Sequence, residues 1–281
     1  MDGGLRLPTD LPDPDALRSP LLVRFFSRVM ARHMASGFHA VRLMRPGVPA
    51  LPADRPVIVY CNHPSWWDPA FLILLASRAF PERRSFGPMD AAALVRYRFM
   101  ARIGLFPVEP DTAAGAVAFM KVGQSLLSRP DAMLWVTAEG RFTDPRARPV
   151  RLRGGIAHLA CRLERVTLLP LALEYPFWEE RTPEALARFG TPLLTEPGSG
   201  LTPARLQEML EDRLEAAMDD LALAARSRDP DRFATLLRGR TGVGGVYDLW
   251  RRCKAWVRGE RFDPAHGSAA AGTAGRKEPT S

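Results

Sequence analysis

A strand, a sharp turn and a helix follow one another closely near residue 60, and this succession constrains the fold more than any other feature. Residues 57–61 form an apolar run of strand length. After the turn at residues 62–67, Asp68-Pro69 opens an apolar segment of helical length at residues 70–80. Strands and helices alternate in this way along the chain. The pattern predicts an α/β fold, a mostly parallel central sheet flanked by helices, with an N-terminal amphipathic helix.

Apolar spacing and turn residues place the other elements. Further strands are predicted at residues 38–43, 104–110, 132–136, 166–173 and 186–194. Helices are predicted at residues 20–36, 90–103, 112–127, 156–163, 203–226 and 246–257. Pro170 lies inside the strand at 166–173 and lacks a backbone N–H, which indicates an edge position or a bulge.

The chain of 281 residues is expected to form one domain at residues 15–262, including the helix at 20–36. The Pro- and Gly-rich residues 1–14 and the last residues, 263–281, are predicted to be disordered tails. The three cysteines, Cys61, Cys161 and Cys253, lie far apart in apolar contexts. This is typical of buried, reduced side chains and argues against a disulfide framework or a zinc site.

The net charge of +8, from 39 basic and 31 acidic residues, indicates an anionic partner. In the helix at residues 20–36, Arg24, Arg28 and Arg32 flank an apolar stripe, and no acid occurs between Asp15 and Asp54. This pattern favours an interfacial membrane helix over a core helix with solvated arginines. The helix at 246–257, with two tryptophans and four cations, is either interfacial or docked. Nucleic acid is disfavoured, because the basic residues flank apolar stripes instead of interleaving with exposed aromatic residues. No secretory signal and no apolar run of about 20 residues is visible, so a soluble or peripheral protein is expected.

His63 and Asp68 lie five positions apart across the turn between the strand and the helix. Such a turn can bring the carboxylate to the imidazole, so that the histidine serves as a general base and the aspartate fixes its tautomer. The alternative is purely structural, because Asp is a favoured N-cap and Pro suits the first helical position. Ser65 and Asp68 also match a loose capping box.

A second cluster follows the strand at 132–136, where Glu139-Gly140-Arg141 precedes a strongly basic run. Gly154-Gly155 then opens a helix, and a glycine pair beside arginines can hold an anion. A solvated loop is the alternative.

Four stretches resemble, in order and spacing, the four blocks of the glycerolipid (lysophosphatidic acid type) acyltransferases. They are Asn62-His63 with Asp68, the turn at residues 104–109, Glu139-Gly140-Arg141, and residues 168–171. The resemblance implies transfer of an acyl chain from acyl-CoA or acyl carrier protein to a hydroxyl of a lipid acceptor. It makes His63 the general base and Asp68 its orienting carboxylate. It also implies a monotopic enzyme, peripheral at the cytoplasmic face of the cell membrane. No metal or other cofactor is expected, because a thioester is already activated.

The resemblance also predicts the substrate-binding residues, which are Asn62, Gly104, Phe106, Glu139, Gly140, Arg141, Arg153 and Pro170. One position departs from the family. Its members commonly close the second block with an arginine that binds phosphate, and this chain has Pro110 there. The basic run at 146–153 can compensate. Otherwise the acceptor is a non-phosphate lipid, a glycolipid or an amine. A third hypothesis is a non-enzymatic membrane-binding protein.

Overall fold

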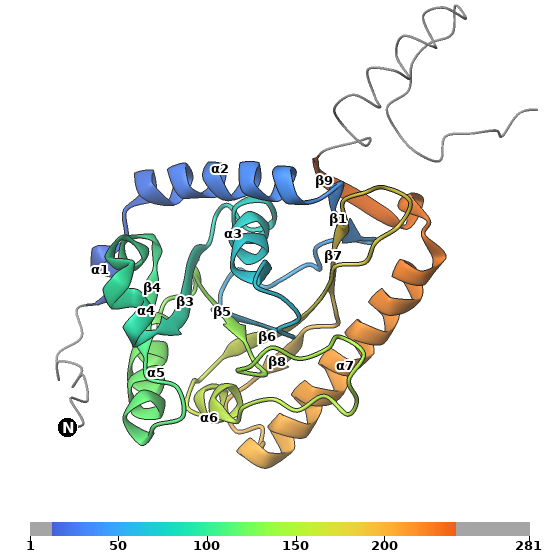
Figure 1. Ribbon diagram of the computed structural model, residues 1–281. Coiled ribbons are helices and arrows are strands. Elements are labelled where there is room, and N and C mark those ends of the chain that lie inside the picture. Colours follow the sequence, from blue (N-terminus) through green and yellow to red (C-terminus); the bar gives the residue numbers. More distant parts are fainter. Residues whose placement is uncertain (1–12, 240–281) are drawn as a thin grey trace, which may run out of the picture.

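The structure is a computed structural model that describes residues 13–239 (Figure 1). The described strands are β1 (Ala40–Met44), β2 (Val57–Cys61), β3 (Arg84–Asp90), β4 (Leu105–Val108), β5 (Ala132–Thr137), β6 (Val166–Glu174), β7 (Glu184–Phe189), β8 (Leu193–Thr195) and β9 (Phe233–Arg238). The described helices are α1 (Pro14–Leu17), α2 (Pro20–Gly37), α3 (Asp68–Ala79), α4 (Ala91–Arg96), η1 (Arg98–Ile103), α5 (Ala113–Leu126), α6 (Gly155–Ala160), α7 (Pro203–Ser227) and η2 (Pro230–Arg232).

The strands form one sheet in the order β4-β3-β5-β2-β6-β7-β1-β9, and β8 pairs with the start of β6. The run from β4 to β6 is parallel throughout, and β1 also pairs in parallel with β7. Antiparallel pairing is confined to β6–β7, β6–β8 and β1–β9. The predicted α/β fold with a mostly parallel sheet is therefore confirmed.

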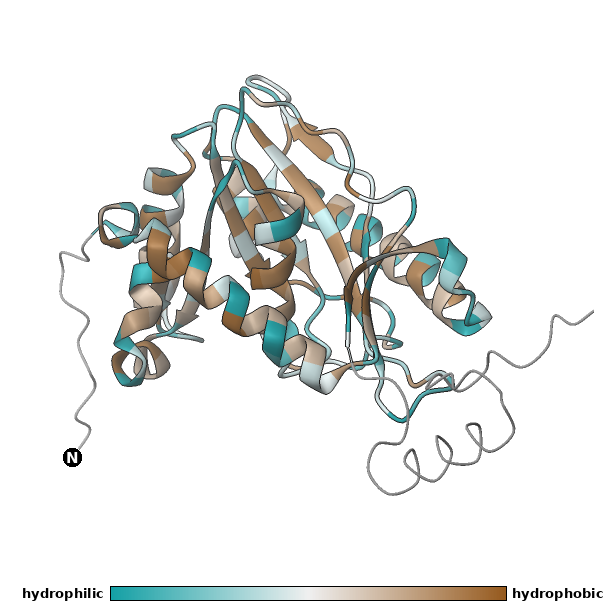
Figure 2. Ribbon diagram, turned by 90° about the horizontal axis from the view of Figure 1, so that it is seen from above, coloured by the Kyte–Doolittle hydropathy of each residue, from teal (hydrophilic) through white to brown (hydrophobic). Residues whose placement is uncertain are grey.

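Helices cover both faces of the sheet because alternate residues of each central strand face opposite sides. In β2, Ile58 and Tyr60 belong to one core cluster with residues of α5, α6 and α7. Val57, Val59 and Cys61 belong to the other cluster, with residues of α2 and α3. All five residues of β2 are buried. This explains why the strand appears in the sequence as a continuous apolar run. Figure 2 shows the same character in the middle of the sheet, where the strands are mostly brown.

Pro170 does not lie at an edge, and that prediction is wrong. β6 lies between β2 and β7, inside the sheet. The carbonyl of Pro170 accepts a hydrogen bond from Gly190 N at 2.9 Å, so its nitrogen faces the same side, toward β7 and β8. Pairing with β8 ends at Leu168 and pairing with β7 begins at Leu171. Pro170 therefore lies in the gap between the segments of β6 that pair with β8 and with β7. Its missing N–H costs no hydrogen bond of the sheet.

Three further expectations about the elements need correction. β3 was not predicted, because its sequence, Arg-Ser-Phe-Gly-Pro-Met-Asp, is polar and carries both strand breakers. β9 was also missed. It pairs with β1, which lies far away in the sequence, and local sequence patterns do not predict such pairing. The strand expected at 186–194 is two strands, β7 and β8, which are separated by a turn at Gly190.

The predicted apolar stripe of α2 is wider than the face that packs on the protein. Met34 is buried, and Met30 packs against the core cluster that includes α3. Leu21 and Phe25 lie farther round the helix and remain 77% and 60% exposed. α2 lies across α3 in Figure 1, so the helix packs on the core and also presents apolar residues outward.

Some expectations concern residues outside the described part of the chain. The predicted helix at 246–257, Cys253 and the tail at 263–281 lie there. Of the N-terminal tail at 1–14, residues 13 and 14 are described, and Pro14 begins α1. Among the described helices, none is long and apolar enough to span a bilayer.

Candidate active site

The candidate site lies at the carboxyl ends of β2, β5 and β6, three adjacent parallel strands. Cys61, the last residue of β2, is in register with Thr137 of β5 and Leu171 of β6. The residues that follow each strand therefore meet at one edge of the sheet. In open α/β sheets this edge is where ligands bind.

Asn62 fastens the turn to the sheet. Its side chain is fully buried, and its Oδ1 accepts a hydrogen bond from Leu173 N at 2.8 Å. Its Nδ2 donates to Leu173 O at 3.0 Å. The amide thus continues the β2–β6 ladder by one step, and the contact points to a positioning role at the residue before His63.

His63 and Asp68 are in contact, as the spacing predicted. His63 Nδ1 lies 2.6 Å from Asp68 Oδ2, and the Asp68 side chain is completely buried. A buried carboxylate at this distance accepts the proton of Nδ1–H, which leaves Nε2 as the basic nitrogen. Among the described residues, no hydrogen bond is made to Nε2, and the His63 side chain is 17% exposed. The imidazole is thus oriented on one side and open to a substrate on the other.

Asp68 does not cap α3, so the N-cap prediction is wrong. It is the first residue of the helix, and Trp67 at the cap position makes no side-chain capping bond. Half of the predicted capping box forms, because Asp68 Oδ2 accepts from Ser65 N at 3.2 Å. Ser65 Oγ accepts instead from Trp67 N, also at 3.2 Å. The Asp68 carboxylate is thus hydrogen-bonded to the backbone of the turn that precedes the helix. The positive end of the helix dipole also stabilises its negative charge.

Tyr175 is a site residue that sequence reasoning missed. Its hydroxyl donates to Asp68 Oδ1 at 2.6 Å, so both carboxylate oxygens of Asp68 are bonded. Burial, together with the negative charge of Asp68, raises the pKa of Tyr175 well above its ordinary value. The hydroxyl therefore stays protonated and remains a donor. Its position directly after β6, beside β2, was the signal that could have found it.

Glu139 holds the backbone of His63. Its Oε2 accepts a hydrogen bond from His63 N at 2.7 Å. Thr143 N donates to His63 O at 3.0 Å, so the loop after β5 binds the histidine backbone on both sides. Burial raises the pKa of Glu139, and the His63 N–H opposes that rise. Glu139, predicted as an acceptor-binding residue, is in contact with the general base itself.

One aromatic ring lies beside the histidine, and others pack behind the turn that carries it. The Phe142 ring lies 4.3 Å from the imidazole, centroid to centroid, and its side chain is 60% exposed. On the buried side, Trp67 packs edge-on against Phe38 at 4.9 Å, and Phe38 contacts Tyr175 at 5.4 Å. The end of α2 thereby supports the catalytic turn. Neither Phe142 nor Phe38 was singled out in the sequence.

Gly140 and Arg153 fit together closely. Gly140 has a positive φ of 67°, and a Cβ on it would lie 1.9 Å from Arg153 Nε. Arg153 Nη1 binds Asp111 Oδ1 at 2.7 Å. Asp111 follows Pro110, so this guanidinium stands beside the turn where the family usually carries its arginine.

The basic run after Gly140 is divided between two roles. Arg148 pairs with Asp219 and Arg151 pairs with Glu211, both of which are on α7. These two arginines fasten the loop to the helix. Arg141 and Arg146 are exposed and form no ion pair with a described residue. Only part of the run is therefore available to an acceptor.

Three predicted site residues are placed in the framework. Gly104 ends η1 with φ 103°, and a Cβ there would lie 2.6 Å from Ser85 O. Phe106 is buried and packs against Phe119 of α5. Pro170 is buried within β6, in register with Tyr60. The structure does not bring these side chains to His63.

The cysteines are only partly as expected. Cys61 is buried, and burial and the charges of Asp68 and Glu139 raise the pKa of its thiol, so it is a poor nucleophile. Cys161 is exposed, contrary to the prediction, because it follows the last residue of the short helix α6. Within residues 13–239, no group of three or more His, Cys, Asp or Glu side chains is placed to hold a metal ion.

Comparison with known proteins agrees with this geometry. Residues 46–174 match the family model described as acyltransferase, and this segment contains β2, α3 and the Glu139 loop. The predicted resemblance to the acyltransferases is therefore confirmed over this segment, which is slightly less than half of the chain. Comparison with curated protein sequences gave no match.

The fold is similar to that of a solved structure, the 1-acyl-sn-glycerophosphate (LPA) acyltransferase PlsC from Thermotoga maritima. The TM-score is 0.50 at 12% sequence identity, and the similarity covers 76% of this chain and 84% of that chain. At this identity the similarity concerns the fold. The family match supports an acyltransferase.

Proposed function

We propose that the protein transfers a fatty acyl chain from acyl-CoA or acyl carrier protein to a hydroxyl of a lysophospholipid or a related lipid acceptor. The observation that carries the proposal is the contact between His63 Nδ1 and the buried Asp68 carboxylate at 2.6 Å. This contact leaves Nε2 basic and directed away from the carboxylate. A general base needs that arrangement, whereas a helix cap does not.

In the proposed reaction, His63 Nε2 takes the proton of the acceptor hydroxyl as its oxygen attacks the thioester carbonyl. The charge of Asp68 stabilises the imidazolium that forms, and Tyr175 and Ser65 hold the carboxylate in place. Collapse of the tetrahedral intermediate expels the thiolate, which receives the proton from His63. The products are an ester and a free thiol. General-base catalysis of this kind contributes about 10²- to 10⁴-fold in rate.

Arg141 and Arg153 support an acceptor that carries a phosphate. Arg141 directly follows the glycine next to Glu139 and has no ion-pair partner among the described residues. Arg153 lies over Gly140 and is 48% exposed. An arginine fork binds a phosphate better than it binds one carboxylate at the surface, where an ion pair contributes about 0–1 kcal/mol. A phosphate can therefore displace Asp111 from Arg153 at little cost.

A specific observation favours the second candidate, which is the same chemistry on a non-phosphate lipid, a glycolipid or an amine. Pro110 is exposed in the turn after β4 and offers no cation. The nearby guanidinium of Arg153 is already bound to Asp111. If that pair persists in the complex, a neutral acceptor fits the site better.

Peripheral association with the cytoplasmic face of the cell membrane is part of the proposal. Leu21 and Phe25 are exposed on α2, next to Arg24 and Arg28. A helix with this mixture lies at the boundary between headgroups and acyl chains. Both long-chain substrates would then reach the site from the bilayer surface.

The test compares the purified protein with its His63→Ala variant. Thiol release from long-chain acyl-CoA and from acyl carrier protein is measured in detergent with a panel of lipid alcohols. We expect release that depends on an acceptor in the parent protein, and a loss of at least about 100-fold in the variant. Equal rates would favour the remaining hypothesis, a non-enzymatic membrane-binding protein.

Pro110→Arg addresses the choice of acceptor. If the missing arginine sets the preference, this variant should gain activity toward phosphate-bearing acceptors relative to neutral ones. Pro110→Gln is the matched uncharged control. An unchanged ranking of acceptors would mean that Arg141 and Arg153 already supply the phosphate site.

A further inference from the structure

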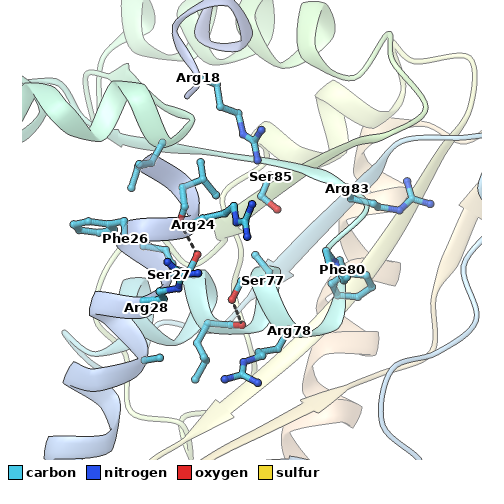
Figure 3. Close-up of a pocket in the computed structure, with 17 residues that line it drawn as sticks. Arg18, Arg24, Phe26, Ser27, Arg28, Ser77, Arg78, Phe80, Arg83 and Ser85 are labelled. Carbon is cyan, nitrogen blue, oxygen red and sulfur yellow. Dashed lines mark hydrogen bonds between the residues drawn. The ribbon is translucent and has the colours of Figure 1, made fainter. Parts of the chain in front are cut away.

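A pocket of about 510 Å³ lies between α2, the C-terminal half of α3 and the loop that follows α3 (Figure 3). Its lining on α3 begins at Ile73, five residues after Asp68, and includes none of the residues that contact His63 or Asp68. It is therefore separate from the site at His63, and the proposed acyl transfer does not use it.

Cations dominate the polar lining of this pocket. Five arginines line it, and none of the lining residues is acidic: Arg18, Arg24, Arg28, Arg78 and Arg83. Arg83 is occupied, because it donates to the backbone carbonyls of Pro52, Arg55 and Pro130. Within the described chain, Arg24, Arg28 and Arg78 are exposed and have no ion-pair partner.

Arg18 forms no ion pair with any residue in the described part of the chain. Its Nε is buried without a hydrogen-bond partner among the described residues. Burial lowers the pKa of Arg18, and the charge of Arg84 lowers it further. The nearby Asp15 is engaged by Arg84 and Arg129. In Figure 3 the guanidinium groups of Arg18 and Arg24 both point toward Ser85, so an anion there would meet two cations.

Apart from three serines, the rest of the lining is apolar, and this restricts which kinds of anion fit the pocket. Phe26, Ile73, Leu74 and Phe80 contribute to the walls. The hydroxyls of Ser27 and Ser77 donate to carbonyls one turn back in their own helices, so they offer no donor to a ligand. A small hydrated anion would leave the apolar walls unused, whereas a phosphate attached to apolar chains would contact both parts.

The neighbouring surface continues this amphipathic character. Leu21 and Phe25, exposed on α2, stand on the same helix as Arg24 and Arg28. Phe26 also stacks on Phe99, which is 45% exposed, at 5.4 Å. Apolar side chains that can enter a bilayer thus adjoin a cationic pocket at headgroup depth.

We propose that this pocket binds the headgroup of an anionic phospholipid of the membrane, with the phosphate between Arg18 and Arg24 and the glycerol and upper acyl chain against the apolar walls. The ligand is a component of the surface on which the protein sits, and it is not consumed. The charge complementarity and the unpartnered Arg18 Nε carry this assignment. It goes beyond acyl transfer and does not depend on it.

The first test uses the full chain and dihexanoyl phosphatidylglycerol below its micelle concentration, with binding measured by calorimetry. We expect saturable binding that Arg18→Gln and Arg24→Gln each weaken at least about tenfold, since each removes a charged donor to the phosphate. Arg32→Gln is the matched control, because Arg32 is exposed on α2, carries the same charge and does not line the pocket. Equal losses in all three variants, or no binding, would overturn the proposal.

A charge-neutral variant separates the cavity from general attraction to anions. Ser77→Leu fills part of the pocket, and the lost hydroxyl bonds only to Leu74 O in the same helix. This variant should weaken dihexanoyl phosphatidylglycerol binding while its thermal unfolding midpoint stays near that of the parent. Undiminished binding would show that the lipid does not occupy the pocket.

Competition identifies the source of the phosphate. Inorganic phosphate, sn-glycerol 3-phosphate and coenzyme A are each titrated against the bound lipid, and none should displace it at comparable concentration. Displacement by the small phosphates would assign the pocket to a free phosphate, and displacement by coenzyme A would assign it to the donor. Either result overturns the lipid assignment. Vesicles of phosphatidylcholine with 30% phosphatidylglycerol then extend the comparison of Arg24→Gln with Arg32→Gln to a bilayer, where Arg24→Gln should bind more weakly.

Discussion

Glu139 Oε2 accepts a hydrogen bond from the backbone N–H of His63 at 2.7 Å, although the two residues are 76 positions apart in the chain. The bond joins the loop after β5 to the turn after β2, and it explains physically why these stretches occur together. A carboxylate that holds the backbone of the general base fixes where the imidazole can go. We infer that Glu139 is a positioning residue in addition to any contact with the acceptor.

Replacing Glu139 tests this role. Glu139→Ala leaves the His63 N–H without its partner, which costs about 1–3 kcal/mol for a buried donor. Glu139→Gln keeps an oxygen that can accept the bond. We expect the alanine variant to lose both thermal stability and thiol-release activity, and the glutamine variant to keep most of both. Equal activity losses in the two variants would mean that the charge of Glu139 matters more than its hydrogen bond.

The pH dependence of stability provides a second measurement on the same residue. Burial raises the pKa of Glu139 in the folded protein, so folding favours the protonated carboxyl. The contribution of Glu139 to stability is thus fully present below its ordinary pKa of 4.5 and is lost as the pH rises through the raised value. Relative to the parent, Glu139→Gln should gain stability on going from pH 4 to pH 8 in urea unfolding. A difference that is constant with pH would contradict the assignment.

Tyr175→Phe removes one donor from the buried carboxylate of Asp68 without changing the ring. Tyr175 packs at 5.4 Å from Phe38, so the ring should stay in place. We expect kcat to fall by about 10- to 150-fold, with KM little changed, because the loss of a hydrogen bond to a charged group costs about 1.5–3 kcal/mol. Tyr97→Phe, at an exposed tyrosine, is the control. In a His63→Ala background, Tyr175→Phe should have no further effect on activity.

Gly140→Ala tests the fit between Gly140 and Arg153. The new methyl group would lie 1.9 Å from Arg153 Nε, so the guanidinium must leave its place beside Asp111. Gly47→Ala is matched for backbone strain, because Gly47 has φ 101° and nothing within 4 Å of its Cβ position. We expect a rise in KM for phosphate-bearing acceptors in Gly140→Ala and none in Gly47→Ala. Unchanged acceptor kinetics in both would remove Arg153 from the acceptor site.

Leu21→Ser with Phe25→Ser tests the outward face of α2. Both side chains are largely exposed, so the double variant should unfold at nearly the same temperature as the parent. Binding to vesicles should weaken by tenfold or more, since burying each side chain in the bilayer contributes about 1.5–3 kcal/mol. Phe26→Ser is the contrasting variant: Phe26 stacks on Phe99, and its loss should lower thermal stability. Unchanged vesicle binding in the double variant would assign the face to another role.

Much of the fold could be read from the sequence, because its central strands are buried on both faces and therefore appear as short continuous apolar runs. β2, β5 and β6 were found in this way. The strands β3 and β9 were not, because their stability comes from neighbours far along the chain instead of from their own residues. Pro170 led to a wrong edge assignment for a related reason. The residue type shows only that Pro170 has no backbone N–H to donate. The arrangement of β7 and β8 shows that no hydrogen bond is needed from that position.

The same division holds for the site. The sequence by itself predicted the contact of His63 with Asp68, because five residues across a strand–turn–helix corner can bring the two side chains together, although it left a helix cap as an alternative. Only the tertiary structure decided that Tyr175 and Glu139 complete the pair, since these residues follow β6 and β5 and meet the turn after β2 through the order of the strands in the sheet. It also decided that Gly104, Phe106 and Pro170 belong to the framework. The chemistry available to each residue follows from its side chain, which the sequence gives. Which of these residues come into contact depends on how strands far apart in the sequence pack together.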